Sequence, residues 1–236
     1  MNMAKRHAVL ALGMAFILSS CASVIGARPA FPTELNTANE TISFASIGFG
    51  QSGSFTAGPY SGNYKRSLKG KSGGLLITRA RETGKTQFVL RGGELMAPLS
   101  GACRANLAEV RLAGFSAETE PFTLRCTLGS DDGMLAATLD LEDDPRAKGF
   151  RQNRIGLVRI NNDVIDIRSL HKKLKGGSAD LALGYVFTRG GSPIAAVDVA
   201  GKPNIVLAKG LDQPTRQMLI SAATGLTLTW TPQVEF

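Results

Sequence analysis

The feature of this sequence that most constrains its fold is an apolar segment near the end that has no polar face. Asp212 can cap a helix that begins with Gln213 and Pro214, since both residue types suit a helix start. Almost no charge follows Arg216, and the apolar residues of the segment are Met218, Leu219, Ile220, Ala222, Ala223 and Leu226. Because a helix that is apolar on nearly every side is buried, the rest of the chain has to surround or cover it.

The chain before this segment predicts β-strands. From residue 43 on, short runs of branched and aromatic residues alternate with glycines and polar turns, as in residues 134–141, 155–160 and 164–167. We count about a dozen such runs at the 8–12-residue spacing typical of all-β folds. The prediction is a mainly β protein, with a curved antiparallel sheet or barrel of about a dozen strands and one buried C-terminal helix.

Two local predictions concern the middle of the chain. Residues 75–79 and 86–91 are expected to pair as a hairpin, because the turn-forming residues 82–85 lie between them. Residues 107–112 fit either a strand or a helix, since Leu107 and Val110 also have helical spacing.

The order of the last elements resembles a known group of proteins. A meander, a turn containing Asp and an apolar helix near the end make residues 184–228, GYVFTRGGSPIAAVDVAGKPNIVLAKGLDQPTRQMLISAATGLTL, similar to the C-terminal part of the tubby-like group, which includes the LURP-one-related and scramblase proteins. The resemblance implies a β-barrel that encloses the helix. It implies no binding residue.

The first residues predict export. Lys5 and Arg6 precede an uncharged apolar run at residues 8–18, which is typical of a secretory signal. A run of this length is too short to cross a bilayer as a stable helix. An ordinary cleaved signal is one interpretation, but Pro29 disfavours the cleavage site that the small residues 27–30 offer.

The end of this signal resembles the lipobox of bacterial lipoprotein precursors, in the residues Leu18-Ser19-Ser20-Cys21. In that family the cysteine receives a diacylglycerol, the chain is cut before it, and the new N-terminus is acylated. Ala22 follows here, and the absence of Asp at that position favours the outer membrane by resemblance to lipoproteins of two-membrane bacteria. The resemblance implies a lipoprotein with palmitate-type acyl chains on Cys21, facing the periplasm. Residues 1–20 would be the signal peptide, 21–42 a lipidated flexible tether, and 43–236 a single β-rich domain.

Cysteine usage agrees with export. After Cys21, only Cys103 and Cys126 remain. An even pair in an oxidising compartment is most simply one disulfide bond, and two buried free thiols are the alternative.

The charge of the chain favours anionic partners. The formal net charge is +8, and loss of Lys5 and Arg6 with the signal leaves 25 basic and 19 acidic residues. Outside the cytoplasm, anionic lipid head groups or acidic envelope polymers suit a positive field better than nucleic acid. An ordinary solvated surface is the simpler interpretation at each candidate for such contacts, which are Lys65, Arg66, Lys69, Lys71, Lys172, Lys173 and Lys175.

Groups for catalysis are scarce. The only histidine after the signal, His171, lies among lysines, and we expect it to be exposed and unsuited to acid–base or metal chemistry. No metal or cofactor is therefore predicted. Paired carboxylates could still cleave a glycoside, and the acids available for that are Asp140, Glu142, Asp163 and Asp166.

The sequence thus leaves two functions open. The first is a non-enzymatic binding or scaffolding module, anchored by Cys21 on the periplasmic face of the outer membrane, with an anionic lipid, an envelope polymer or another envelope protein as partner. The second is a carboxylate-dependent hydrolase of envelope glycan or lipid. The hydrolase requires a deep pocket with two facing acids, whereas the binding module requires an apolar cavity or a basic face.

Overall fold

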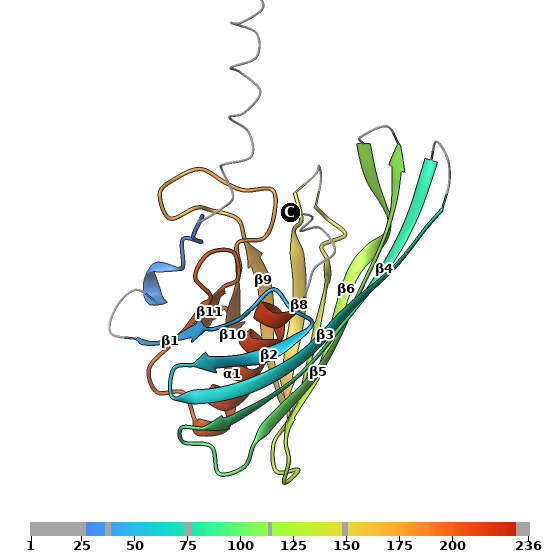
Figure 1. Ribbon diagram of the computed structural model, residues 1–236. Helices are drawn as coiled ribbons and strands as arrows, with labels where there is room; N and C mark the ends of the chain where they lie inside the picture. Colours follow the sequence, from blue (N-terminus) through green and yellow to red (C-terminus); the bar gives the residue numbers. More distant parts are fainter. Residues whose placement is uncertain (1–26, 36–38, 74–76, 113–114, 148–150, 230–236) are drawn as a thin grey trace, which may run out of the picture.

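The computed structural model describes residues 27–35, 39–73, 77–112, 115–147 and 151–229. Within these residues, twelve antiparallel strands form a closed barrel, and one α-helix lies inside it (Figure 1). This confirms the predicted fold class. The strands are β1 (Glu40–Ala45), β2 (Ser52–Ala57), β3 (Tyr60–Gly73), β4 (Ile77–Gly92), β5 (Leu99–Leu112), β6 (Phe115–Ser130), β7 (Ala136–Asp143), β8 (Arg154–Ile160), β9 (Asp163–Leu170), β10 (Gly184–Arg189), β11 (Ser192–Asp198) and β12 (Asn204–Leu207).

The barrel is a meander in which each strand pairs with the next one in the sequence. The first and last strands close it, with Glu40 opposite Leu207 and Ser43 opposite Asn204. Among the described strands, closure leaves no edge along the body of the barrel, so backbone groups there are paired without a second chain. Apolar side chains that alternate along the strands point inward and form one continuous core with the helix.

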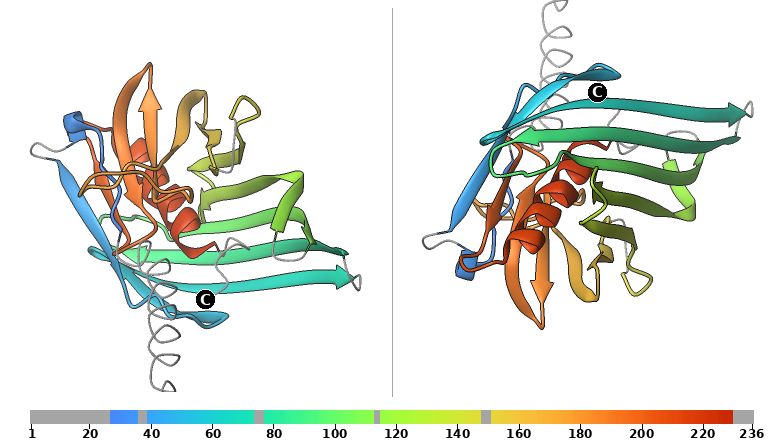
Figure 2. Two further views of the ribbon diagram at one scale, coloured as in Figure 1. Left: turned by 90° about the horizontal axis from the view of Figure 1, so that it is seen from above. Right: turned by 90° about the horizontal axis from the view of Figure 1, so that it is seen from below.

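Helix α1 (Gln213–Leu228) fills the barrel, as Figure 2 shows from both ends. The side chain of Asp212 accepts a hydrogen bond of 2.9 Å from the backbone N–H of Thr215, which confirms the predicted N-cap. Twelve residues of the helix are buried, including Ser221 and Thr224, because strands surround it on all sides. No helix in the described residues is long and apolar enough to span a membrane.

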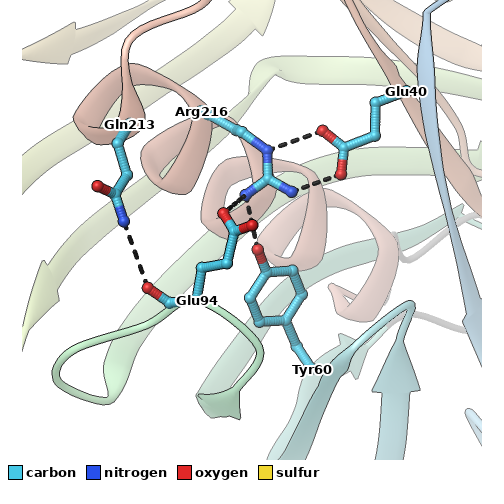
Figure 3. Close-up of polar contacts among 5 residues, drawn as sticks. All are labelled: Glu40, Tyr60, Glu94, Gln213 and Arg216. Atoms are coloured by element: carbon cyan, nitrogen blue, oxygen red, sulfur yellow. Dashed lines mark hydrogen bonds and ion pairs between the residues drawn. The ribbon is translucent and has the colours of Figure 1, made fainter.

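The first turn of α1 is tied to the strand that closes the barrel (Figure 3). Arg216 donates hydrogen bonds to both carboxylate oxygens of Glu40 on β1, the one from Nε measuring 2.7 Å, and another of 2.7 Å to the Tyr60 hydroxyl. Glu94 lies 3.7 Å from the same guanidinium, and its backbone carbonyl accepts a bond from Gln213. The hydrogen bond from Arg216 lowers the pKa of Glu40, and it raises the pKa of Arg216 in return. One polar cluster therefore connects the start of the helix to the strand that closes the barrel.

Four strands are much longer than the rest. β3, β4, β5 and β6 have 14 or 16 residues each, whereas the other eight have 4 to 8. β2 pairs with β3 only as far as Lys65, and β7 pairs with β6 only as far as Thr123. The remainder of the four strands forms a sheet that extends past the barrel wall (Figures 1 and 2).

The long strands correct one prediction and settle another. Residues 82–85 are not a turn: they lie inside β4, with Gly84 opposite Leu68 on β3 and Ala105 on β5. Pairing on both sides keeps this polar stretch extended, a tertiary effect that local turn propensity does not report. Residues 107–112 belong to β5 and are strand, not helix.

The fold includes residues that precede position 43. Strand β1 starts at Glu40, and the short 3₁₀ helix Thr33–Leu35 packs on the barrel with Leu35 buried against Ala196 and Val206. The predicted flexible tether therefore does not extend to residue 42. Cys21 lies outside the described residues.

The predicted disulfide is present. Cys103 and Cys126 lie directly opposite each other on β5 and β6, and their bonded sulfurs face the interior of the barrel. The bond joins two of the four long strands at the level where the sheet leaves the barrel wall.

Candidate anion-binding face

Exposed cations gather on the outer face of the four long strands. Register places Lys85 on β4, Arg104 on β5 and Arg125 on β6 side by side in one row across the sheet. Lys65, on β3, lies beside this row, opposite Gln87. All four side chains are exposed, because the residues that alternate with them point into the barrel. We call Lys65, Lys85, Arg104 and Arg125 the basic face.

Few negative charges balance the basic face. Within the described ranges, no carboxylate pairs with Lys65, Lys85 or Arg104, and Arg104 contacts only the amide oxygen of Asn106, at 3.4 Å. Arg125 lies 3.7 Å from Asp140, but Asp140 also accepts a 2.9 Å bond from Arg159. Since adjacent strands are about 4.8 Å apart, the row from β4 to β6 brings three like charges within about 10 Å. An anion bound there would relieve their repulsion.

The surface next to the basic face is hollow and lined by small side chains. One hollow of about 670 Å³ includes all four cations, and a second of about 990 Å³ continues from it along the barrel wall. The two share Ser52, Lys65, Gln87, Ala102 and Thr127. Farther from the cations, the lining of the larger hollow is neutral: its exposed or half-buried residues are short, among them Asn63, Val89, Ser100, Gly129 and Ala136, and the buried Tyr64, Phe88 and Leu128 also contribute to it.

Arg66 does not belong to this face, contrary to the prediction. It is 7 % exposed and points inward, where its guanidinium donates to the backbone carbonyls of Gly48, Gly50 and Leu228. It therefore joins the loop before β2 to the last turn of α1. Its neighbour Lys65 is exposed only because successive residues of a strand face opposite sides.

Three of the other predicted contacts, Lys172, Lys173 and Lys175, lie elsewhere, on the loop between β9 and β10. The structure does not bring them together with Lys65. Lys69 is exposed farther along β3, and the side chain of Lys71 lies outside the described part of the structure. Three members of the basic face were not predicted, because Lys85, Arg104 and Arg125 are separated in sequence and only the strand register aligns them.

His171 is buried, which corrects the prediction of an exposed residue. Only 8 % of it is accessible, and its Nδ1 lies 3.1 Å from the carbonyl of Ala179. Since a carbonyl can only accept, Nδ1 carries the hydrogen and Nε2 accepts the bond from the Ser169 hydroxyl, 2.9 Å away. Burial lowers the pKa of His171, and the charges of Arg151 and Arg154 act in the same direction.

Ser169 and His171 are hydrogen-bonded, as a nucleophile and its general base would be, but their surroundings are not those of a catalytic pair. The Ser169 hydroxyl also accepts a 2.9 Å bond from the backbone N–H of Arg154, and both side chains are buried. A backbone carbonyl, not a carboxylate, holds His171. These bonds join β8, β9 and the loop after β9, so the pair serves to hold that loop.

Arg154 is a second buried cation in the same region. Its guanidinium carbon lies 3.7 Å from the centre of the Phe122 ring, and it donates a 3.2 Å bond to the Tyr185 hydroxyl. Asp143 is 3.7 Å from its Nε. Aromatic and polar partners compensate for the removal of its charge from water.

The acids considered for hydrolysis are mixed with arginines. Asp140, Glu142 and Asp166 line a groove of about 830 Å³ on the outside of β6 to β10, together with Arg159 and Arg168. Asp140 and Asp166 are both opposite Leu157, on the two strands that flank it, so their backbones are about 10 Å apart. Asp163 is elsewhere and pairs with Arg189.

No group of three or more His, Cys, Asp or Glu side chains in the described part of the chain could hold a metal ion. Comparison of the whole chain with known protein families, with curated proteins and with solved structures finds no match.

Proposed function

We propose that this protein is a lipid-anchored, non-enzymatic binding module of the bacterial envelope, and that its basic face binds an anionic ligand with an apolar part. The observation that carries the proposal is the meeting of two surfaces. The row Lys85, Arg104 and Arg125 borders a hollow whose lining away from the cations is neutral and largely made of short side chains. The cations suit a phosphate or carboxylate group, and the hollow beside them suits an acyl chain or a similar apolar group.

The proposed location favours the same class of ligand. The signal and lipobox resemblance of residues 1–21 favour a position at an envelope membrane, where anionic amphiphiles are abundant. A buried disulfide between Cys103 and Cys126 suits an oxidising compartment.

The alternative hydrolase has less support from the groove of acids. A glycosidase requires one carboxyl group that donates a proton and a second that acts as base or nucleophile. Asp140 instead contacts Arg125 and Arg159, and Arg168 lies in the same groove as Asp166. The pattern is that of a network of surface ion pairs.

Calorimetric titration with a short-chain phosphatidic acid, below its critical micelle concentration, tests the proposal. We expect saturable binding by the natural protein, and binding weaker by at least about tenfold in K85E/R104E, since each charge-assisted hydrogen bond contributes about 1.5–3 kcal/mol. Inorganic phosphate and a short-chain phosphatidylcholine should each bind more weakly, because one lacks the chain and the other lacks the net charge.

The matched control is R91E/K209E, which changes two exposed cations outside both hollows and alters the net charge equally. It should bind phosphatidic acid like the natural protein. Equal binding by K85E/R104E and the natural protein would refute the proposed site.

A further inference from the structure

The N-terminal segment is attached to one particular loop of the barrel. Pro29 forms a β-bridge with Lys173, the backbone N–H of Ala30 donates to the carbonyl of Lys172, and that of Leu174 donates to the carbonyl of Arg28. Both bonds measure 2.8 Å. The described chain therefore enters the fold alongside residues 172–174.

This loop, residues 171–183, carries a cationic and apolar tip. Lys172 and Lys175 are exposed, and Leu174 between them is 62 % exposed although it is a large apolar residue. Gly176 and Gly177 have φ angles of 94° and 79°, which let the loop reverse directly after Lys175. An exposed leucine flanked by lysines suits contact with an anionic membrane surface, where lysines meet the head groups and an apolar side chain enters the interface.

Hydrogen bonds at the base of the loop hold its tip in position. The buried bonds of His171 to Ser169 and to the Ala179 carbonyl join the two sides of the loop at its base, and the backbone N–H of Ala179 donates to the carbonyl of His171. Arg28, which pairs with the buried Asp198, holds the N-terminal segment to β11. The lysines and Leu174 are thus displayed on a supported surface.

The length of chain before the fold restricts how far this tip can be from an anchor. Cys21 precedes Ala27, the first described residue, by six residues. A fully extended chain of that length spans at most about 20 Å. If Cys21 carries the acyl chains, the bilayer surface is within about 20 Å of Ala27 and of the adjacent loop.

We infer that this end of the barrel docks on an anionic membrane surface, with Lys172 and Lys175 among the head groups and Leu174 inserted at the interface. The inference rests on the proposed lipid anchor at Cys21, and it adds a second contact that orients the barrel. The opposite end of the barrel, with the turn between β8 and β9, then faces away from the membrane. Strand β9 runs from that turn to the docking loop, and its residue Val164 is about 20 Å from Leu170.

Depth-dependent quenching tests the docking in the full lipidated chain. The sequence has one tryptophan, Trp230, so a W230F background makes an introduced indole the only one. L174W places the probe at the loop tip, and V164W, at a site 48 % exposed, places it at the opposite end. Both proteins are reconstituted into vesicles of phosphatidylethanolamine and phosphatidylglycerol that contain brominated phosphatidylcholine.

The expected result is a blue shift and at least half of the emission quenched for L174W, and no quenching for V164W. Adding K172E/K175E to L174W should abolish the quenching while the protein still cosediments with the vesicles, whereas R91E/K209E should leave the quenching unchanged. K172E/K175E and R91E/K209E each replace two exposed cations and change the net charge by the same amount.

Two results would overturn the inference, and they are distinguishable. Unquenched L174W on vesicles that retain the protein would refute the docking while the anchor stands. Protein that is not retained, with an unmodified Cys21 by mass spectrometry, would refute the anchor and the docking together.

Discussion

The backbone of Gly225 lies directly against the disulfide sulfur of Cys103. A Cβ atom on Gly225 would be 2.9 Å from Cys103 Sγ and 3.4 Å from Cys126 Sγ. The first distance is shorter than ordinary van der Waals contact, so the disulfide occupies the volume that a side chain at position 225 would need. The helix therefore approaches β5 and β6 more closely than any other residue at this position would allow.

We predict that G225A destabilises the protein, by about 1–3 kcal/mol, because the new methyl group overpacks the core against a bond that cannot rotate away. The sign of the change in unfolding free energy is informative, since replacing Gly with Ala inside a helix otherwise stabilises a protein by about 1 kcal/mol. Urea unfolding monitored by circular dichroism measures the change.

A control without overpacking is G70A, on strand β3. A Cβ on Gly70 would have ordinary contact, 3.5 Å from Cγ of Glu82, and the change should be near neutral. In a C103A/C126A background, the cost of G225A should shrink. An undiminished cost there would mean that the sulfurs are not the obstacle.

Removal of the disulfide itself should cost about 3 kcal/mol in C103A/C126A, from the lost restriction of the unfolded chain. The two cysteines are 23 residues apart, and both are buried against the helix. Alkylation of the unfolded natural protein without reductant should modify neither thiol. Labelling at Cys103 or Cys126 would contradict the bond.

Arg216 should stabilise the closure of the barrel. R216M removes the hydrogen bonds to Glu40 and Tyr60 and is expected to cost about 2 kcal/mol, since the guanidinium is largely buried and charge-assisted bonds are lost. Hydrogen exchange should rise first where β1 pairs with β12, at residues 40–43 and 204–207. R159M, which loses an exposed pair with Asp140, should cost less than about 1 kcal/mol. Equal costs for the two variants would refute a special role for Arg216.

His171 should make stability depend on pH below neutrality. Its pKa is lower in the folded protein than the usual value of about 6.5, so the unfolded chain binds a proton first as the pH falls. Stability is full above about pH 6.5 and decreases below it, until the pH reaches the lowered pKa of the folded state. Glu40 acts separately: its lowered pKa confers stability above about pH 4.5 that is lost in stronger acid.

Unfolding free energies between pH 7 and pH 5 measure this effect. H171Q should be less stable at pH 7 but should lose the slope across this interval, because it removes the titrating group. A slope that persists in H171Q would assign it to other residues.

The lipid anchor has a direct test. C21A should release the protein from membrane fractions, since the acyl chains on Cys21 are the proposed stable attachment. Cosedimentation of C21A with membranes in high salt would contradict the anchor.

Much of the architecture was predictable because it follows from local physics. An apolar helix with no polar face, from Gln213 onward, has to be surrounded by other elements. Runs in which apolar residues alternate with polar ones predict the strands that surround it. Asp212 before Pro214 marks the helix start for a reason that is local in the sequence. The pairing of Cys103 with Cys126 was predictable from the cysteine count together with the expected export.

The candidate site was not predictable in the same way. Lys85, Arg104 and Arg125 become neighbours only through the register of β4, β5 and β6, and register is decided by which faces the barrel buries. Lys65 and Arg66 illustrate the point, since adjacent cations of similar sequence context face opposite sides of β3.

The sequence by itself determined the class of fold, the burial of the last helix and the partner of each core cysteine, because periodicity, capping and cysteine number act over short distances or by simple exclusion. Only the tertiary structure decided that residues 82–85 stay extended, that His171 is buried and that the cations of three strands meet. Each of these outcomes depends on a neighbouring strand or loop, which supplies pairing on both edges, an acceptor carbonyl or a shared face. The fold, and not the local sequence pattern, brings that neighbour into place.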